Sequence, residues 1–323
     1  MLTATILSLA LTGTLTTPLA AGVTVTQVKS FGHIRATAVA TALKGTLFAV
    51  ASEDNMVRIM DSKTMKTVFQ LKGHPRTPKA VGFSPNGRYL LTGDESARIW
   101  LWDVKTGKKI REFSRDRGHT RGIQSFAFTK DGKRFASVGG DDVIKIWNLS
   151  GGHPKFTIKG NGANFYGAAF LPSGALVTGT LAEGMRMYEP KKFALAAKMS
   201  VGGGQGANGI AVNRAGTFAV TAGRDGRNIV WNLKTRKQVG SIKAHNDWVY
   251  NVAFSPNGRV AVSSSADTKV VVWDVKTFKK LATISGRSFV DSVVAITGDG
   301  KYILSTDSGN VLQMHKLSPA QSK

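Results

Sequence analysis

The chain has 323 residues, of which 42% are hydrophobic and none is cysteine. The lack of cysteine excludes disulfides, thiol chemistry and cysteine-ligated zinc, and a chain of about 300 residues buries enough core to fold as one domain without them. With 44 Lys and Arg against 20 Asp and Glu, the formal net charge is +24, which points to anionic partners.

Residues 1–22 differ in kind from the rest of the chain. They contain no charged side chain, an apolar stretch lies at 6–15, and small residues surround Ala21. This pattern resembles a secretory signal peptide cleaved near Ala21, although no Lys or Arg follows Met1. The segment is too short and too rich in Thr for a transmembrane helix. We therefore predict a secreted or periplasmic protein, with a cytoplasmic protein that keeps this extension as the alternative.

From residue 23 to residue 323 the chain repeats itself. Trp followed by Asp or Asn recurs at 102, 147, 231 and 273, and degenerate dipeptides at 60, 188 and 315 keep the steps between 41 and 45 residues. A period of this size indicates stacked supersecondary units. Fourteen or fifteen residues before each of these positions lies a turn glycine: Gly45, Gly87, Gly132, Gly174, Gly216, Gly258 and Gly300.

Each unit has the pattern of short strands. Turns such as the Ser-Pro-Asn-Gly at 84–87 supply the positive φ that tight hairpins need. The apolar runs between turns, such as 252–254 and 270–273, are too short for helices and rich in β-branched residues. No stretch has a sustained helical period, so the chain is predicted to be all-β.

The Gly-His dipeptides, the Ser-Pro-Asn-Gly turns and the Trp-Asp closes resemble the WD-repeat family over residues 23–323. Seven units imply a seven-bladed β-propeller, with repeats ending near residues 72, 117, 159, 201, 243, 285 and 317. In that family a blade can carry a hydrogen-bonded tetrad of His, Ser or Thr, Asp and Trp. Two blades match it in full, with His119, Ser137, Asp141 and Trp147, and with His245, Ser263, Asp267 and Trp273. The second blade has Ser96 at the position of the Asp, and the fourth blade departs most from the pattern.

The two ends of the repeat region predict how the ring closes. Each complete unit continues after its Trp-Asp into a fourth strand, whereas the seventh unit stops at Leu317. The run Val-Thr-Val-Thr-Gln-Val-Lys at 23–29 has the spacing of that missing strand, as the resemblance also implies. We predict that residues 23–30 complete the seventh blade, which removes exposed sheet edges.

In a propeller of this family, two kinds of turn share each face. We call the strands of a blade a to d from the inside outward, so the d–a and b–c turns form the top face. Arginine recurs here two residues after the repeat histidine position, and aromatic residues stand across the ring. Because Arg and aromatic residues are enriched in binding hot spots, we predict a protein partner for Arg35, Arg76, Arg121, Phe165, Tyr166, Trp248 and Tyr250.

The a–b and c–d turns form the bottom face, which is rich in lysine. We predict that this face binds a polyanion, such as anionic glycan, the lipid headgroups of a membrane surface or nucleic acid, through Lys105, Lys108, Lys109, Lys234, Arg236, Lys237, Lys276, Lys279 and Lys280. Nucleic acid is the weakest of the three, because the face lacks interleaved aromatic residues for base stacking. The alternative is that these charges only solvate the surface.

Enzyme signatures are weak in this sequence. Four of the six histidines occupy the structural position of the repeat, no His pair has metal-ligand spacing, and no Gly-x-Ser-x-Gly elbow occurs. The glycine-rich match to a dinucleotide fingerprint at 204–209 lies between predicted strands, with no helix following it. We predict a non-catalytic scaffold, monomeric by itself, without cofactor or metal. The alternative is an exported hydrolase or lyase that acts on an anionic substrate at the channel mouth, with Asp247, Asp291 and Ser292 as its only candidate residues.

Overall fold

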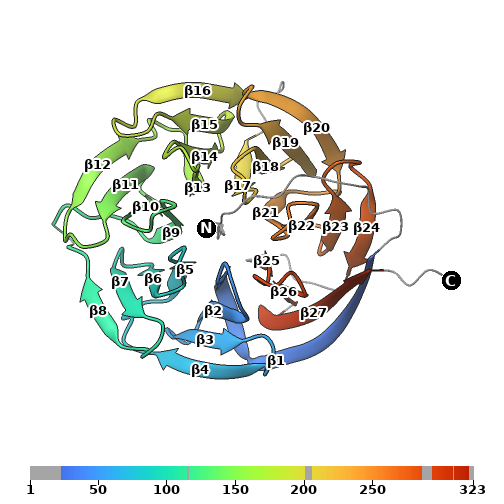
Figure 1. The fold of residues 1–323 in the computed structure, drawn as a ribbon, viewed down its shortest axis with the longest axis horizontal. Coiled ribbons are helices and arrows are strands. Elements are labelled where there is room, and N and C mark those ends of the chain that lie inside the picture. The colour runs from blue at the N-terminus through green and yellow to red at the C-terminus, as the bar shows by residue number, and fades with distance from the viewer. Residues whose placement is uncertain (1–22, 115, 201–205, 286–292, 308, 320–323) are drawn as a thin grey trace.

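The computed structural model describes residues 23–114, 116–200, 206–285, 293–307 and 309–319. These residues form β-strands and connecting turns, arranged as seven blades in a closed ring (Figure 1). The predicted all-β, seven-bladed propeller is therefore confirmed. Within the described ranges, the chain forms no helix with the length and hydropathy of a membrane span. The predicted signal peptide at 1–22 lies outside the described residues, as do Asp291 and Ser292.

The strands of each blade follow one another from the ring axis outward (Figure 1). Blade 1 contains the second part of β1 (Val23–Thr41), β2 (Leu47–Ser52), β3 (Val57–Asp61) and β4 (Lys66–Leu71). Blade 2 contains β5 (Pro78–Phe83), β6 (Tyr89–Asp94), β7 (Ile99–Asp103) and β8 (Lys109–Glu112). Blade 3 contains β9 (Ile123–Phe128), β10 (Arg134–Gly139), β11 (Val143–Asn148) and β12 (Pro154–Lys159).

The remaining blades repeat this order. Blade 4 contains β13 (Phe165–Phe170), β14 (Leu176–Thr180), β15 (Gly184–Tyr188) and β16 (Leu195–Ser200). Blade 5 contains β17 (Ala207–Val212), β18 (Phe218–Gly223), β19 (Arg227–Asn232) and β20 (Lys237–Lys243). Blade 6 contains β21 (Val249–Phe254), β22 (Val260–Ser265), β23 (Val270–Asp274) and β24 (Lys280–Ile284). Blade 7 contains β25 (Val294–Ile296), β26 (Tyr302–Thr306), β27 (Val311–Pro319) and the first part of β1.

Strand β1 closes the ring because it belongs to two blades. Its first part pairs antiparallel with β27, from Val23 opposite Pro319 to Arg35 opposite Val311. Its second part pairs with β2, so that blades 7 and 1 form one seven-stranded sheet. Across the closing pair, the Nε2 of Gln27 donates a hydrogen bond to the Oε1 of Gln313 at 2.7 Å. The predicted closure by the N-terminal strand is confirmed.

The seven turn glycines all adopt the left-handed conformation, with φ between 66° and 85°. In blade 2 the Gly87 N–H donates to the carbonyl of Ser84 at 2.9 Å, and the Ser84 hydroxyl accepts from the Tyr89 N–H at 2.9 Å. The c–d turn is tied to this a–b turn, because the Val104 N–H donates to the Arg88 carbonyl at 2.9 Å. The same bond joins Val275 to Arg259 in blade 6. The a–b and c–d turns therefore share the bottom face.

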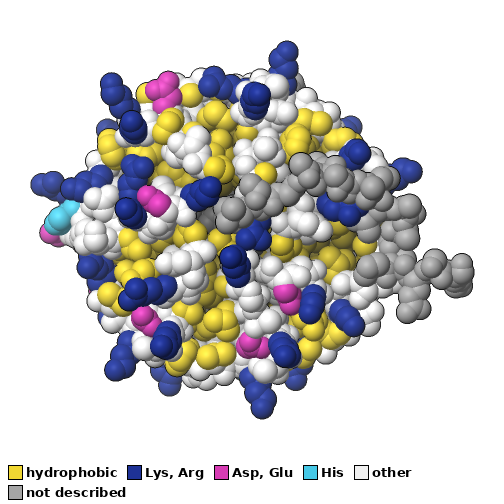
Figure 2. Space-filling model, in the orientation of Figure 1, with side chains coloured by type: hydrophobic (Ala, Val, Ile, Leu, Met, Phe, Trp, Pro, Cys, Tyr) yellow, Lys and Arg dark blue, Asp and Glu magenta, His cyan; other side chains and the backbone are white. Residues whose placement is uncertain are grey.

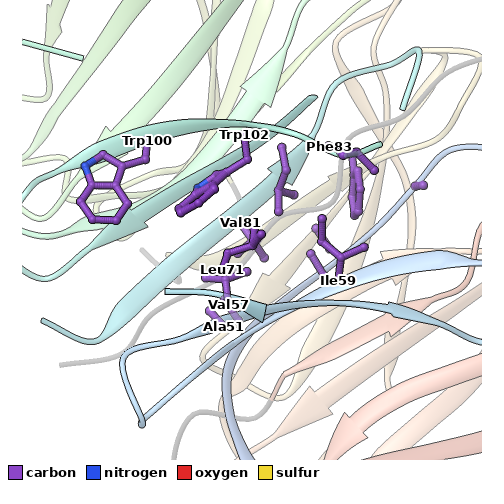
Figure 3. Close-up of a cluster of buried hydrophobic side chains, with 14 residues drawn as sticks. Ala51, Val57, Ile59, Leu71, Val81, Phe83, Trp100 and Trp102 are labelled. Carbon is purple, nitrogen blue, oxygen red and sulfur yellow. The ribbon is translucent and has the colours of Figure 1, made fainter. Parts of the chain in front are cut away.

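Hydrophobic side chains fill the interfaces between neighbouring blades. The interface of blades 1 and 2 includes the eight residues labelled in Figure 3, each at most 4% exposed: Ala51, Val57, Ile59 and Leu71 from blade 1, and Val81, Phe83, Trp100 and Trp102 from blade 2. Each buried Val, Leu, Ile or Phe side chain contributes about 1.5–3 kcal/mol relative to an exposed one. Because the ring is closed, every blade has such an interface on both sides, and this rigid frame holds the turns in place.

Candidate functional site

In blade 3 a buried polar network fixes the top-face loop that carries Arg121. The Nδ1 of His119 lies 2.9 Å from the Oδ1 of Asp141, and its Nε2 lies 2.7 Å from the Ser137 hydroxyl. The indole N–H of Trp147 donates to the same hydroxyl at 2.8 Å. Burial raises the pKa of Asp141, but the hydrogen bond and charge of His119, together with backbone N–H donors such as that of Thr120, hold the pKa below its ordinary value. The ionised carboxylate thereby ties the loop before β9 to the b–c turn.

The acid of blade 2 differs from the sequence expectation. Asp94, rather than a residue at the position of Ser96, places its Oδ2 2.8 Å from the Nδ1 of His74. The hydroxyl of Ser96 instead donates to the Oδ1 of the same carboxylate at 2.7 Å. The spacing argument missed Asp94 because it lies two residues earlier, at the end of β6. The side chains of His74 and Asp94 are both fully buried.

Blade 4 replaces the network with an ion cluster. The Nε and Nη2 of Arg186 donate to Glu183 at 2.8 and 3.0 Å, and the Nζ of Lys198 donates to it at 2.6 Å. The Nη1 of Arg186 donates to the Gly160 carbonyl at 3.0 Å, which anchors the connection between blades 3 and 4. The hydrogen bonds from Arg186 lower the pKa of Glu183 to about 2. A charged cluster therefore holds the loop where the repeat histidine is missing.

The innermost strands of six blades share a β-bulge near the top face. In β5, Pro78 pairs with Asp94 and Ala80 with Gly93, so that Lys79 is the extra residue of the bulge. The same two-against-one register occurs in the other five inner strands, and the extra residues are Thr37, Lys79, Gln124, Tyr166, Asn208 and Tyr250. Bulges of this kind re-aim a side chain out of the regular alternation. No periodicity in the sequence marked this position.

Three of these bulge residues line one pocket. It has a volume of about 500 Å³ and lies at the top ends of blades 2, 3 and 4. Its walls carry Lys79 and Glu95 from blade 2, Arg121, Gln124 and Asp142 from blade 3, and Asn164, Phe165 and Tyr166 from blade 4. The Oε1 of Gln124 and the Oδ1 of Asp142 are buried and have no hydrogen-bond partner among the described residues. The pocket thus has buried acceptors, the Lys79–Glu95 ion pair at 3.7 Å, the Arg121 cation and two aromatic rings in its walls.

The structure separates the predicted top-face residues. Arg121, Phe165 and Tyr166 lie together in the pocket. Arg35 forms an exposed ion pair with Glu53 at 3.6 Å, and Arg76 is exposed outside the pocket lining.

The other two predicted aromatic residues lie on blade 6. Trp248 is 38% exposed and packs under the guanidinium of Arg224, 4.5 Å from the ring centroid. Tyr250 is the bulge residue of β21. Asp247, a candidate of the enzyme alternative, accepts a hydrogen bond from the Trp248 N–H at 2.7 Å.

All nine predicted polyanion-binding residues are exposed, and Figure 2 shows Lys and Arg side chains spread around the ring with few Asp and Glu among them. Two of the nine are engaged: Lys109 lies 4.0 Å over the ring of Trp100, and Arg236 donates to the Ala196 carbonyl at 3.2 Å. A cavity at this face is lined by basic residues of the a–b turns instead, which were not among the nine. In the sequence, each of these basic residues stands one or two positions before a turn glycine.

The repeats of this chain are similar to those of known proteins. The family model described as "WD domain, G-beta repeat" matches residues 65–103, 107–148 and 236–274. WD repeat-containing protein 1 of Gallus gallus is 31% identical over 101 residues, which are 31% of this chain and 17% of that protein. The ribosome biogenesis protein WDR12 homolog of Drosophila virilis is 25% identical over 228 residues, 62% of this chain and 53% of that protein. The chain thus spans about half or less of the length of these relatives.

These relatives correct the predicted localisation. The relatives matched over 62% of the chain are named for ribosome biogenesis, which takes place inside the cell. The prediction of a secreted or periplasmic protein is therefore wrong. The error arose because an apolar, uncharged N-terminus was interpreted by its composition alone.

Proposed function

Because this chain belongs to the WD-repeat family and folds as a seven-bladed β-propeller, we propose that it is a non-catalytic interaction scaffold that binds a protein partner at the top-face pocket. Fold alone does not determine function, so the proposal depends on the pocket. The observation that carries it is the convergence of Arg121, Phe165 and Tyr166 with two further bulge residues, Lys79 and Gln124, around one cavity of about 500 Å³. That volume lies in the range of sites that enclose a ligand group.

The pocket chemistry suits a segment of polypeptide. Arg121 makes no hydrogen bond or ion pair with another described residue, so it is available for a carboxylate of the partner. The free oxygens of Gln124 and Asp142 accept N–H donors, which a peptide backbone supplies. Tyr166 and Phe165 add aromatic surface of the kind enriched in hot spots. A peptide with an acidic side chain satisfies all three features at once.

The names of the relatives agree with a scaffold. Proteins named for ribosome biogenesis match 62% of the chain at 24–25% identity. Assembly of a large particle requires surfaces that hold partners rather than transform them, and a rigid ring with loops at both faces serves that purpose. We propose that the partner is a protein component of such an assembly, and we do not assign its identity.

Site-specific photocrosslinking in the full chain tests the proposal. A photoreactive phenylalanine analogue at Tyr166 is expected to capture a partner that the same analogue does not capture at Phe156, which is 39% exposed on the outer strand β12. Arg121→Glu should abolish the capture, and Arg76→Glu, the same charge change outside the pocket, should leave it intact. Equal capture by both arginine variants contradicts the proposal.

A further inference from the structure

We infer that the bottom face carries a binding site for a compact, multiply charged phosphate ligand, at a cavity lined by the a–b turns of blades 1, 2, 3 and 5. The cavity has a volume of about 340 Å³, and its charged lining residues are Lys44, Lys130 and Arg214. The a–b turns lie at the ends of the inner strands opposite to the bulges, so this site is separate from the top-face pocket. The phosphate site does not depend on the proposed scaffold function.

The three cations come from three different blades and have no counter-charge in the cavity. None of the described lining residues is acidic. Lys44, Lys130 and Arg214 form no ion pair with any described residue. Like charges that converge without a carboxylate repel one another, and a bound polyanion relieves that repulsion. The arrangement therefore favours a ligand with several negative charges over one with a single carboxylate.

Arg214 adds a specific donor to this charge. Its Nε atom is buried and has no hydrogen-bond partner among the described residues. A buried donor without an acceptor costs about 1–3 kcal/mol, so an oxyanion that accepts from it gains affinity. The guanidinium presents its N–H groups in a planar fork that fits phosphate oxygens in pairs. This orphan donor distinguishes the cavity from the lysines of the c–d turns, which extend into solvent.

A second basic groove continues from the cavity toward the rim. The two share Asn86, and the groove is lined by Arg88, Arg111, Lys133 and Arg134. The one acid among its described lining residues, Asp131, is engaged within its own turn, where it accepts from the Thr129 hydroxyl at 2.6 Å and the Lys133 N–H at 3.0 Å. The positive potential thus extends outward from the cavity between blades 2 and 3. A phosphate chain, or a phosphorylated headgroup that enters from the rim, follows this path.

Calorimetric titration of the full chain with sodium tripolyphosphate tests the site. Binding is expected, and it should weaken with salt because screening shortens the reach of surface charges. The triple variant Lys44→Gln, Lys130→Gln, Arg214→Gln should lose at least about tenfold in affinity. Its matched control, Lys105→Gln, Lys234→Gln, Lys276→Gln, removes the same formal charge from exposed c–d turns and should stay within about threefold of the unmodified chain. If the triple variant unfolds, Lys44→Gln alone at an exposed side chain should still weaken binding by about threefold.

Two arms separate the sources of the phosphate. Cosedimentation with phosphatidylcholine vesicles that contain a phosphoinositide, reversed by tripolyphosphate, identifies a lipid headgroup. Binding of tripolyphosphate without cosedimentation identifies a free phosphate compound. The inference is overturned if tripolyphosphate does not bind, or if both triple variants lose affinity equally, since the effect is then that of net charge alone.

Discussion

Asn228 of blade 5 donates a hydrogen bond from its Nδ2 to the hydroxyl of Ser263 in blade 6, at 3.0 Å, and both residues are fully buried. In blades 2, 3 and 5 the indole N–H of the repeat tryptophan donates to the equivalent hydroxyl instead. In blade 6 the indole N–H of Trp273 is buried without a partner among the described residues. A polar bond between blades thus takes the place of one within a blade.

This exchange predicts unequal costs for two substitutions. Asn228→Ala frees the Ser263 hydroxyl to accept from Trp273, so we expect a loss of about 1 kcal/mol in the free energy of unfolding. Ser263→Ala removes the hydroxyl that both His245 and Asn228 contact and should cost about 2–3 kcal/mol. Urea-induced unfolding of the two variants measures both values. Equal costs would show that Trp273 does not take over the bond.

The ion cluster of blade 4 should contribute stability that depends on pH. The folded-state pKa of Glu183 is about 2, below its ordinary value of 4.5. A carboxyl group whose pKa is lower in the folded chain stabilises that chain at pH values above its ordinary pKa. This stability is lost as the pH falls toward the folded-state pKa. We expect Glu183→Gln to cost about 2 kcal/mol at neutral pH, because Arg186 is then buried without its partner. Unfolding followed by circular dichroism measures the cost.

The pH profile of the same variant checks the cause. Its difference from the unmodified chain should narrow below pH 4.5, where Glu183 of the unfolded chain is protonated. A difference that stays constant with pH would assign the cost to packing rather than to charge.

The fully buried pair of blade 2 predicts a second acid-sensitive contribution. Burial raises the pKa of Asp94, but the hydrogen bonds from His74, Ser96 and the Arg98 N–H, together with the charge of His74, leave the pKa below its ordinary value. Asp94→Asn should therefore lower the melting temperature most at neutral pH, and the effect should shrink as the pH falls below the ordinary carboxyl pKa of 3.8. Ser96→Ala, which removes one hydrogen bond but keeps the carboxylate, is the control and should cost about 1 kcal/mol. A larger effect of Asp94→Asn at acid pH than at neutral pH would contradict this assignment.

Closure of the ring predicts a strong effect of the N-terminal strand. Deletion of residues 23–30 removes most of the ladder with β27 and leaves that strand as an exposed edge. We expect a large fall in the melting temperature and self-association on size-exclusion chromatography. Val68→Thr, at a residue that is 46% exposed on the outer strand β4, is a control that should leave both unchanged. If the deletion variant melts at the same temperature as the intact chain, the first part of β1 does not stabilise the ring.

The local features of this protein were determined by its sequence. The turn glycines, the short β-branched strands and the Trp-Asp closes act within a few residues of themselves, so their period of about 42 residues predicted the seven blades. The closing role of residues 23–30 followed from the same count, because the seventh unit lacked one strand. Charge also belonged to the sequence, since the excess of Lys and Arg does not depend on the fold.

Only the tertiary structure decided which side chains meet. Arg35, Arg76 and Arg121 occupy equivalent positions in the repeat, yet only Arg121 lines the pocket, because each blade places different neighbours beside it. Lys44 and Arg214 are far apart in the chain but line one cavity, since a closed ring brings turns of separate blades to the same axis. The bond of Asn228 with Ser263 likewise joins two different blades, which the repeat pattern of a single blade does not predict. The period of the repeat determines how each blade is built. The residues that depart from this pattern and form a site become neighbours only when the ring closes.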